Sequence, residues 1–156
     1  MAGEYFIRAA VAADQKQIRA LIAEARINPL GLNWSNFLVA EDTTGSIIGV
    51  GQVKEHSDGS RELASIATRP GRQRGGVATL LIRELLRREV GVLYLYCESR
   101  NRAFYPRFGF YAVTAAELPK AIQPVFRTSQ FFAWLARTLA GQELRLVAMR
   151  RDPAAF

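Results

Sequence analysis

The stretch Gln73-Arg74-Gly75-Gly76-Val77-Ala78-Thr79-Leu80-Leu81 lies between a strand-like segment, residues 63–68, and a segment of helical periodicity, residues 77–90. Its two glycines allow a tight turn and a close approach of the backbone to a ligand. The helix that follows leaves its first N–H groups without intrahelical partners, and its start carries partial positive charge. The stretch therefore predicts an anion-binding turn, and Arg72 and Arg74 add full positive charges beside it.

The order of residues in this turn separates it from two common phosphate-binding motifs. A P-loop requires Gly-Lys-Ser/Thr after its glycines, and none follows Gly76. A dinucleotide fingerprint requires Gly-x-Gly-x-x-Gly, and that spacing is also missing. What remains is Gln-x-x-Gly-x-Ala, formed by Gln73, Gly76 and Ala78. This pattern resembles the acetyl-CoA pyrophosphate loop of the GNAT N-acetyltransferase superfamily, which has Gln/Arg-x-x-Gly-x-Gly/Ala.

The composition is that of a globular protein of ordinary domain size. The chain has 156 residues, 49% of them hydrophobic, and we expect one domain over residues 1–156. No apolar run approaches the ~20 residues that cross a bilayer, and the N-terminus lacks a signal pattern, so we expect a cytoplasmic protein without a membrane partner. One cysteine, Cys97, and one histidine, His56, offer no disulfide and no metal cluster.

The pattern of apolar residues predicts a mixed α/β sheet. Strands are expected at residues 5–10, 37–42, 46–54, 61–68, 92–97, 109–113 and 143–149, and helices at residues 14–26, 77–90 and 129–139. Three meandering strands followed by a strand-helix-strand crossover predict an antiparallel part first and a parallel pair at the anion-binding turn. The resemblance implies the GNAT acyltransferase fold, with six to seven strands, helices on both faces and a splay at the cofactor site.

A second motif, Phe104-Tyr105-x-x-x-Gly109-Phe110, looks like the late GNAT motif. By this resemblance Tyr105 is the general acid that protonates the departing CoA thiolate. The alternative is that Tyr105 only packs in the core. Many relatives carry an Asn seven residues before the tyrosine, whereas this chain has Glu98 there, which puts a role for Ser99 or Asn101 in doubt.

The resemblance further implies acetyl-CoA as co-substrate. It assigns the pyrophosphate to the backbone of the turn and the pantetheine and thioester to the preceding strand, where the N–H of Ile66 or Ala67 would polarise the thioester carbonyl. The cofactor-binding residues expected in this way are Ile66, Ala67, Thr68, Gln73, Arg74, Gly75, Gly76, Val77, Ala78 and Thr79.

Acetyl transfer also needs a neutral amine, and a free ammonium has a pKa of about 10. Glu62, eleven residues before Gln73, matches the general-base glutamate of the histone-acetyltransferase branch; an exposed ion pair with Arg61 or Lys54 is the alternative. His56 or a water remains open as the base, although a solvated loop histidine is the simpler interpretation. Cys97 is expected to be a core residue, because direct transfer needs no acyl-enzyme.

The acceptor is left open between a small molecule such as an amino acid, which we favour, and a protein lysine or N-terminus. Positive charge from Lys54, Arg61 and Arg127 favours an acceptor with a carboxylate. A non-catalytic CoA-binding or sensor domain is the alternative function. The net charge of +7 would also suit nucleic acid, but one Arg-Gly-Gly is no RGG tract, and we expect no nucleic-acid partner. For residues 126–139 we favour core packing over an acceptor wall, a lid or a homodimer contact, and Asn33 and Trp34 are considered as acceptor contacts, with packing favoured for Trp34.

Overall fold

The first strands form an antiparallel ladder in the computed structural model, which describes residues 3–141 and 145–153. β1 (Tyr5–Ala9) pairs with β2 (Phe37–Asp42), and β2 pairs with β3 (Ile47–Glu55). The Asp42 carboxylate closes the β2–β3 turn by accepting hydrogen bonds from the N–H groups of Thr44 and Ser46 at 2.9 and 3.1 Å. This is the local chemistry that makes aspartate a turn residue, and it confirms the predicted hairpin.

The chain divides into two compact units. The N-terminal unit comprises Met1–Lys54 and Leu63–Glu89, and the C-terminal unit comprises Glu55–Glu62 and Val90–Phe156. Strand β4 (Arg61–Thr68) contributes its first two residues to the C-terminal unit and the others to the N-terminal unit. A single domain over residues 1–156 stays a prediction.

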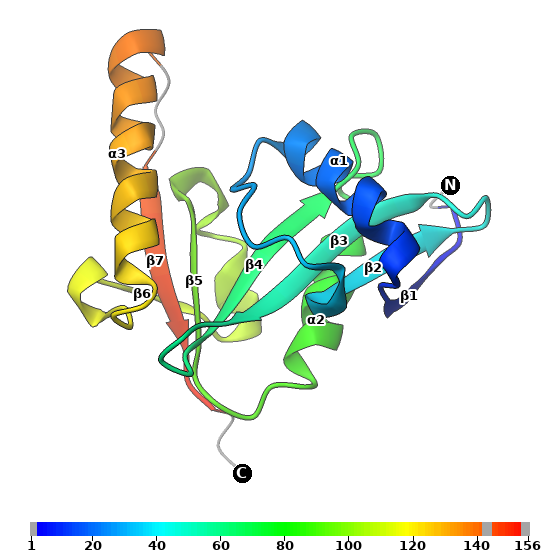
Figure 1. Ribbon diagram of the computed structural model, residues 1–156, viewed down its shortest axis with the longest axis horizontal. Helices are drawn as coiled ribbons and strands as arrows, with labels where there is room; N and C mark the ends of the chain where they lie inside the picture. The colour runs from blue at the N-terminus through cyan, green and yellow to red at the C-terminus, as the bar shows by residue number, and fades with distance from the viewer. Residues whose placement is uncertain (1–2, 142–144, 154–156) are drawn as a thin grey trace. The chain divides into compact units, whose positions relative to one another are not determined.

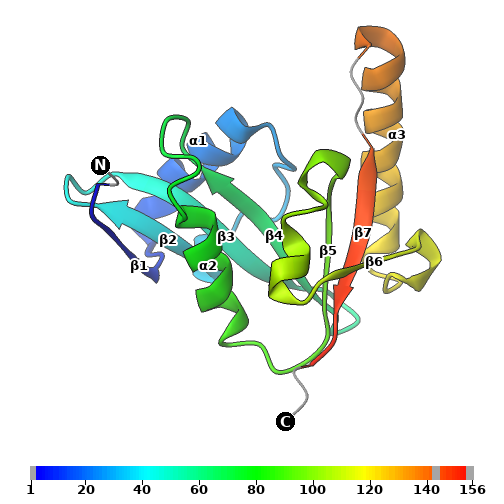
Figure 2. The same cartoon turned by 180° about the vertical axis from the view of Figure 1, so that it is seen from behind.

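Two helices cover opposite faces of the sheet in the N-terminal unit, as Figures 1 and 2 show from opposite sides. α1 (Gln15–Ala25) presents Ile18, Leu21 and Ile22 to a buried cluster at helical spacing. The sheet residues of that cluster include Phe37, Val39, Ile47, Val50 and Ala67. α2 (Val77–Leu86) packs on the opposite face of β3. The position of its first turn therefore depends on the side chains of β3 on that face.

Two glycines of β3 let α2 lie close to the sheet. A Cβ at Gly49 would come within 2.5 Å of Val77 Cγ1 and 3.0 Å of Leu81 Cδ1. A Cβ at Gly51 would come within 2.7 Å of Ile66 Cδ1 and 3.1 Å of Leu85 Cδ1. Since α2 begins at Val77, these glycines fix where the helix starts.

The entry into α1 is held by a buried ion pair. Asp14 is 5% exposed and accepts hydrogen bonds from both terminal nitrogens of Arg8, at 2.7 and 3.1 Å, and from the Val11 N–H at 2.8 Å. The Arg8 hydrogen bond, against the cost of burial, lowers the pKa of Asp14 below its usual range. This pair therefore stabilises the fold at neutral pH, and its contribution is lost as the pH falls through that lowered pKa.

The C-terminal unit is built around β5 (Leu93–Glu98). β5 pairs in parallel with the start of β4, Arg61 with Leu93 and Glu62 with Tyr94. It pairs antiparallel with β7 (Leu146–Arg151), which pairs with β6 (Tyr111–Val113). α3 (Gln123–Ala140) packs on these strands through a buried cluster that contains Leu118, Ile122, Phe126, Ala148 and, partly buried, Tyr94 and Tyr96.

The strand order β1-β2-β3-β4-β5-β7-β6 completes a mixed seven-stranded sheet. It confirms the predicted mixed α/β fold, and the β4–β5 pairs within the C-terminal unit confirm that the sheet contains a parallel pair. The splay at the cofactor site stays a prediction. In the part of the chain that the structure describes, no helix combines the length and apolar character that crossing a bilayer requires.

Element boundaries differ by three or more residues from the predictions at three places, and the other boundaries lie within two residues of them. α2 ends at Leu86 rather than at residue 90, and α3 starts at Gln123, where Pro124 suits a first helical turn, rather than at residue 129. β7 begins at Leu146, and residues 143 and 144 of the predicted last strand lie outside the described residues.

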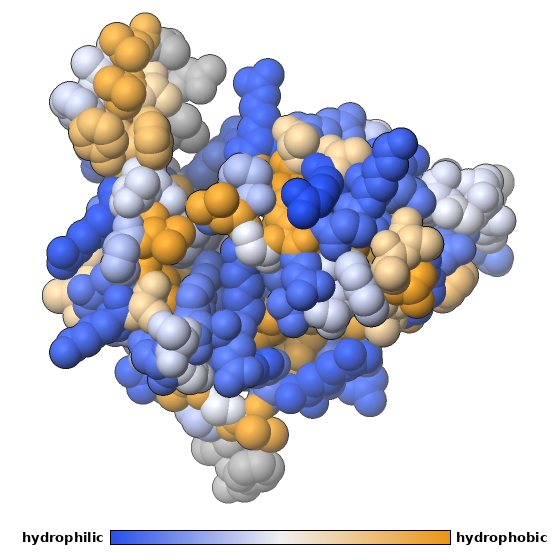
Figure 3. Space-filling view, viewed as in Figure 1, coloured by the Kyte–Doolittle hydropathy of each residue, from blue (hydrophilic) through white to orange (hydrophobic). Residues whose placement is uncertain are grey.

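Core packing, which we favoured for residues 126–139, is wrong for most of that segment. Phe126 is buried, but Phe131, Phe132 and Trp134 are 57%, 61% and 56% exposed. Figure 3 shows hydrophobic side chains gathered on the upper part of α3. Helical spacing alone does not predict this, because only the first turns of α3 reach the sheet residues that bury Phe126.

We expect Gly49→Ala to lower the free energy of unfolding by about 1–3 kcal/mol, because the new methyl group overlaps Val77. Gly91→Ala is the matched control: no atom lies within 4 Å of the added Cβ, and a change within about 0.5 kcal/mol is expected. Urea denaturation of the two variants measures both values. Equal stability of Gly49→Ala and the unmodified protein would show that α2 is not seated by this glycine.

Candidate active site

The turn before α2 contains two residues with left-handed backbone. Arg74 and Gly76 have positive φ values of 67° and 81°, on either side of Gly75, and Gly76 is the N-cap of α2. An anion-binding nest combines right-handed and left-handed residues, so left-handed residues at a helix start are compatible with such a nest. The first intrahelical bond joins the Leu80 N–H to the Gly76 carbonyl at 3.0 Å, so the amides of Val77, Ala78 and Thr79 precede the helical ladder.

The charges around the turn differ from the expectation at one residue. Arg72 forms an ion pair with Asp42 at 3.4 Å and donates to the Gly3 carbonyl, also at 3.4 Å. Its charge is therefore partly neutralised within the N-terminal unit. Arg74 is exposed and has no ion pair or hydrogen bond to any residue that the structure describes. Arg74 is thus the cation of the turn that remains available to a ligand.

Strand β4 is distorted at Ser65, which sequence reasoning missed. Ser65 has a φ of 57°, a conformation that costs a residue with a side chain about 1 kcal/mol or more. The buried Gln52 holds it: its Nε2 donates to Ser65 Oγ at 2.8 Å and to the Gly31 carbonyl at 3.2 Å. Ile66, Ala67 and Thr68 follow directly, so the residues assigned to the thioester begin at a locked irregularity in the strand.

The loop between α1 and β2 uses its polar groups for its own structure. Asn33 caps a 3-10 turn, Trp34–Asn36, by accepting from the Ser35 N–H at 3.1 Å. The Trp34 N–H donates to Gln15 Oε1 at 2.8 Å, and the indole packs, partly buried, against the core of the N-terminal unit. Packing is therefore confirmed for Trp34, and Asn33 as an acceptor contact stays a prediction.

Glu62 is not the exposed ion pair that formed the alternative interpretation. Its side chain is 5% exposed, and Oε2 lies 2.7 Å from Nε2 of His56, whose side chain is 18% exposed. Arg61 pairs with Glu55 instead, at 3.4 Å. The two candidates for the base are therefore in direct contact, within the C-terminal unit, because the β3–β4 hairpin brings its two ends together.

Tyr105 begins a 3-10 helix, Tyr105–Phe108, after the turn that follows β5. Its ring contacts Phe104 and Phe110 edge-on, with centroids 5.3 and 6.1 Å away. Burial, and then the neighbouring Cys97, raise the pKa of the Tyr105 phenol well above its ordinary value. The phenol therefore keeps its proton throughout the neutral range and can donate it where negative charge develops.

Cys97 has the properties of a core residue. It is buried, and burial, followed by the charge of Glu98, raises the pKa of its thiol to about 11. A thiolate is scarcely populated at neutral pH under these conditions, so Cys97 is unsuited to nucleophilic attack. Glu98, at the position where relatives carry Asn, forms an ion pair with Arg100.

The predicted site residues fall into two groups. Residues 66–68 and 73–79 belong to the N-terminal unit, where both Ala67 and Val77 border Gly49. Glu62 and Tyr105 belong to the C-terminal unit, together with His56. The first group contains main-chain N–H groups that could bind an anion. The second group contains two candidate general bases in contact, Glu62 and His56, and the protonated phenol of Tyr105.

The N-terminal unit thus contains a helix start preceded by left-handed residues, and the C-terminal unit contains a protonated phenol and a buried carboxylate. The chain belongs to the acetyltransferase (GNAT) domain family, whose pattern matches residues 33–112, just over half of the chain. The matched region contains Glu62, the turn before α2 and Tyr105. No curated protein matches the sequence.

Solved structures share the fold at low sequence identity. N-acetylglutamate synthase from Neisseria gonorrhoeae, complexed with coenzyme A and N-acetyl-glutamate, superposes with a TM-score of 0.75 and 18% sequence identity. The superposition covers 99% of this chain and 36% of the synthase chain. Rv2747 from Mycobacterium tuberculosis, in complex with CoA, gives 0.69 and 17% over 96% of this chain and 99% of its own. A GNAT acetyltransferase from Staphylococcus aureus Mu50 gives 0.68 and 12%, over 96% and 99%.

We expect Cys97 to react slowly with iodoacetamide at neutral pH and faster as the pH rises toward about 11, because only the thiolate is nucleophilic. Since Cys97 is the only cysteine, mass spectrometry of the intact chain gives its alkylation rate directly. The same reaction in denaturing urea is the control and should be fast. Rapid alkylation of the folded protein at pH 7 would contradict the assignment of Cys97 to the core.

Proposed function

We propose that this protein is an acetyl-CoA-dependent N-acetyltransferase that moves an acetyl group directly to a primary amine of a small molecule, such as an amino acid. The observation that carries the proposal is the start of α2, where the left-handed residues Arg74 and Gly76 precede a helix whose first N–H groups lie outside the helical ladder. Family membership supports acetyl transfer, and the CoA complexes of the solved relatives support the co-substrate.

The backbone of the turn fits a diphosphate. A pyrophosphate needs several donors on one side and no crowding side chain, and no atom lies within 4 Å of the place of a Cβ at Gly76. Gln73, Arg74, Gly75 and Gly76 are all exposed, so a ligand has access to their N–H groups. The amides of residues 74–79, with the charge of Arg74, are the groups that we assign to the pyrophosphate.

The strand before the turn is assigned to the thioester. A donor aimed at the thioester carbonyl stabilises the negative charge that forms there when the amine attacks. The N–H of Ile66 or Ala67 is proposed for this role, with Thr68 beside it, because Ser65 redirects the backbone immediately before them. The bond from Gln52 to Ser65 keeps this conformation without help from a ligand.

Two proton transfers complete the reaction. The amine attacks the acetyl carbonyl carbon, the bond from that carbon to sulfur breaks, and the thiolate leaves. Glu62 and its partner His56 are proposed to remove the proton of the acceptor ammonium, since an ammonium has no lone pair for attack. Tyr105 is proposed to give its proton to the thiolate and to recover one from solvent.

The solved relatives and the basic residues of this chain both bear on the class of acceptor. The N. gonorrhoeae synthase holds N-acetyl-glutamate in one structure and L-arginine in another, and a small amino acid suits a fold of that kind. The cations expected to bind an acceptor carboxylate are partly engaged, however: Lys54 donates to the Leu30 carbonyl at 3.0 Å and Arg61 pairs with Glu55.

We expect Tyr105→Phe to bind acetyl-CoA as the unmodified enzyme does and to lose about 100-fold or more in kcat, because only the proton donor is removed. Thiol release over a panel of amino acids, polyamines and lysine peptides measures the rate. Tyr111→Phe is the control, because that exposed phenol donates to Asp152 among the described residues and its loss should leave activity within about two-fold. Equal kcat for Tyr105→Phe would refute the assigned role. Tight CoA binding without turnover of any amine would indicate a sensor domain.

We expect Gly76→Ala to weaken CoA binding by about ten-fold or more, because a Cβ disfavours the φ of 81° that aims the turn's N–H groups. Gly141→Ala carries the same kind of strain, φ 66°, at the end of α3 and should retain the affinity. Isothermal titration calorimetry with CoA compares the two. Matching losses in both variants would show that the effect is instability and not the turn.

A further inference from the structure

We propose that the imidazole of His56 takes the proton from the acceptor ammonium and that Glu62 is its positioning residue, which rests on the proposed function. The feature that carries this inference is the 2.7 Å contact between His56 Nε2 and Glu62 Oε2. His56 follows the last residue of β3, and Glu62 is the second residue of β4. The sequence resemblance implies that Glu62 is the general base, whereas this inference assigns that role to His56.

The hairpin turn that carries His56 is fixed by backbone hydrogen bonds. The His56 N–H donates to the Ser60 carbonyl at 2.8 Å, and the Gly59 N–H donates to the His56 carbonyl at 2.9 Å. The Asp58 carboxylate accepts from the Ser60 N–H at 3.0 Å and from the Ala121 N–H at 3.2 Å, which ties the turn to the segment before α3. A side chain held on such a turn is already in its working position.

The contact decides which nitrogen of His56 carries hydrogen. An ionised carboxylate only accepts hydrogen bonds, so Nε2 must be the donor in the neutral imidazole. The lone pair then lies on Nδ1, which makes no hydrogen bond to the residues that the structure describes. A buried carboxylate that selects the tautomer of an imidazole is the arrangement of hydrolytic triads, in which the imidazole is the base.

Basicity gives the same assignment. A neutral imidazole is a stronger base than a carboxylate, so the imidazole is the chemically better acceptor for the proton of an ammonium. Glu62, 5% exposed against 18% for His56, is also the member of the pair with less access to an incoming amine.

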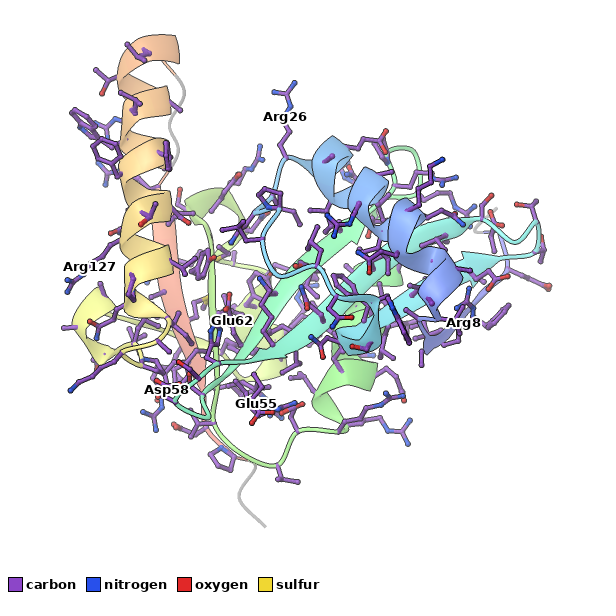
Figure 4. All side chains as sticks on the ribbon, viewed as in Figure 1. Arg8, Arg26, Glu55, Asp58, Glu62 and Arg127 are labelled. Atoms are coloured by element: carbon purple, nitrogen blue, oxygen red, sulfur yellow. The ribbon has the colours of Figure 1, made fainter. Side chains whose placement is uncertain are left out.

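The other charged groups near the pair are already engaged. Glu55 and Arg61, on the same hairpin, form an ion pair with each other. Tyr94, the neighbour of Glu62 on β5, accepts a hydrogen bond from Arg150 at 3.4 Å. Figure 4 shows Arg127 of α3 directed away from the hairpin. Asp58 is bound by the turn itself, and its pKa is lowered by the Ser60 hydroxyl.

The proton balance of the step is simple. The acceptor R–NH₃⁺ gives one proton to Nδ1 of His56 and becomes R–NH₂, whose lone pair attacks the acetyl carbon. The imidazolium that forms keeps its Nε2–H bond to the Glu62 carboxylate, which offsets its charge. Solvent then removes the proton from the partly exposed ring and restores the neutral tautomer.

The test measures acetyl transfer by His56→Gln and by the unmodified enzyme over a range of pH. Two acceptors are compared: ethylamine, an ordinary amine that is protonated at pH 7, and a fluorinated ethylamine that is already neutral at pH 7. Glutamine can still donate to Glu62 but takes no proton. We expect kcat/KM for the ordinary amine to fall about 100-fold or more in His56→Gln, and less than about ten-fold for the neutral one. We also expect the pH profile of the unmodified enzyme to fall on its acid side, and we expect this acid limb to be absent from His56→Gln.

Two further variants separate the outcomes. Glu62→Gln should lower the rate but keep the acid limb, because the imidazole is still present, and Glu55→Gln, an exposed carboxylate on the same hairpin, should change the rate less than about two-fold. An acid limb that survives in His56→Gln and vanishes in Glu62→Gln would overturn the inference and make Glu62 the base. Absence of transfer by the unmodified enzyme to any amine would instead overturn the proposed function, and this inference with it.

Discussion

The structure depends on the close contact between α2 and the glycines of β3. A helix start binds an anion only if its N–H groups are held in one direction, and a helix held by flexible side chains would not meet that condition. Val77 Cγ1 and Leu81 Cδ1 lie 2.5 and 3.0 Å from the place that a Cβ of Gly49 would take, so the first turns of α2 pack closely on the sheet. The left-handed residues Arg74 and Gly76 come directly before this packed helix.

In the C-terminal unit, burial of side chains controls the chemistry of the candidate residues. Burial raises the pKa of the Tyr105 phenol and keeps it protonated, and Glu62 Oε2 lies 2.7 Å from His56 Nε2 in the same unit. The phenol is the proton donor that we propose, and the imidazole–carboxylate contact is the proton acceptor that we propose. Acetyl transfer to an amine requires both, since one proton leaves the nucleophile and one joins the thiolate.

The sequence predicts correctly the elements that depend on short local patterns of residues. Strand β4 was predicted with both of its ends, and the turn from Gln73 to Ala78 was placed before a helix that begins at Val77. These elements follow from alternation, glycine positions and the apolar spacing of α2. The family resemblance of the turn was confirmed by the match over residues 33–112.

The parts that were missed depend on contacts between distant positions. The positive φ of Ser65 requires a buried Gln52 on the neighbouring strand, and serine itself gives no signal for it. The pairing of His56 with Glu62 depends on how a turn folds, and the sequence left the histidine as a solvated loop residue. Arg72 was expected to add its full charge beside the turn, but Asp42, thirty positions away, partly neutralises that charge.

Amide chemical shifts test the central claim most directly, because that claim concerns individual N–H groups. A nitrogen-15-labelled sample titrated with CoA should show its largest downfield amide shifts at residues 74–79, as expected for N–H groups that donate to phosphate oxygens. The Gly76 and Val77 signals should move together and saturate at the same CoA concentration. Saturable CoA binding that leaves the signals of residues 74–79 in place would contradict the account.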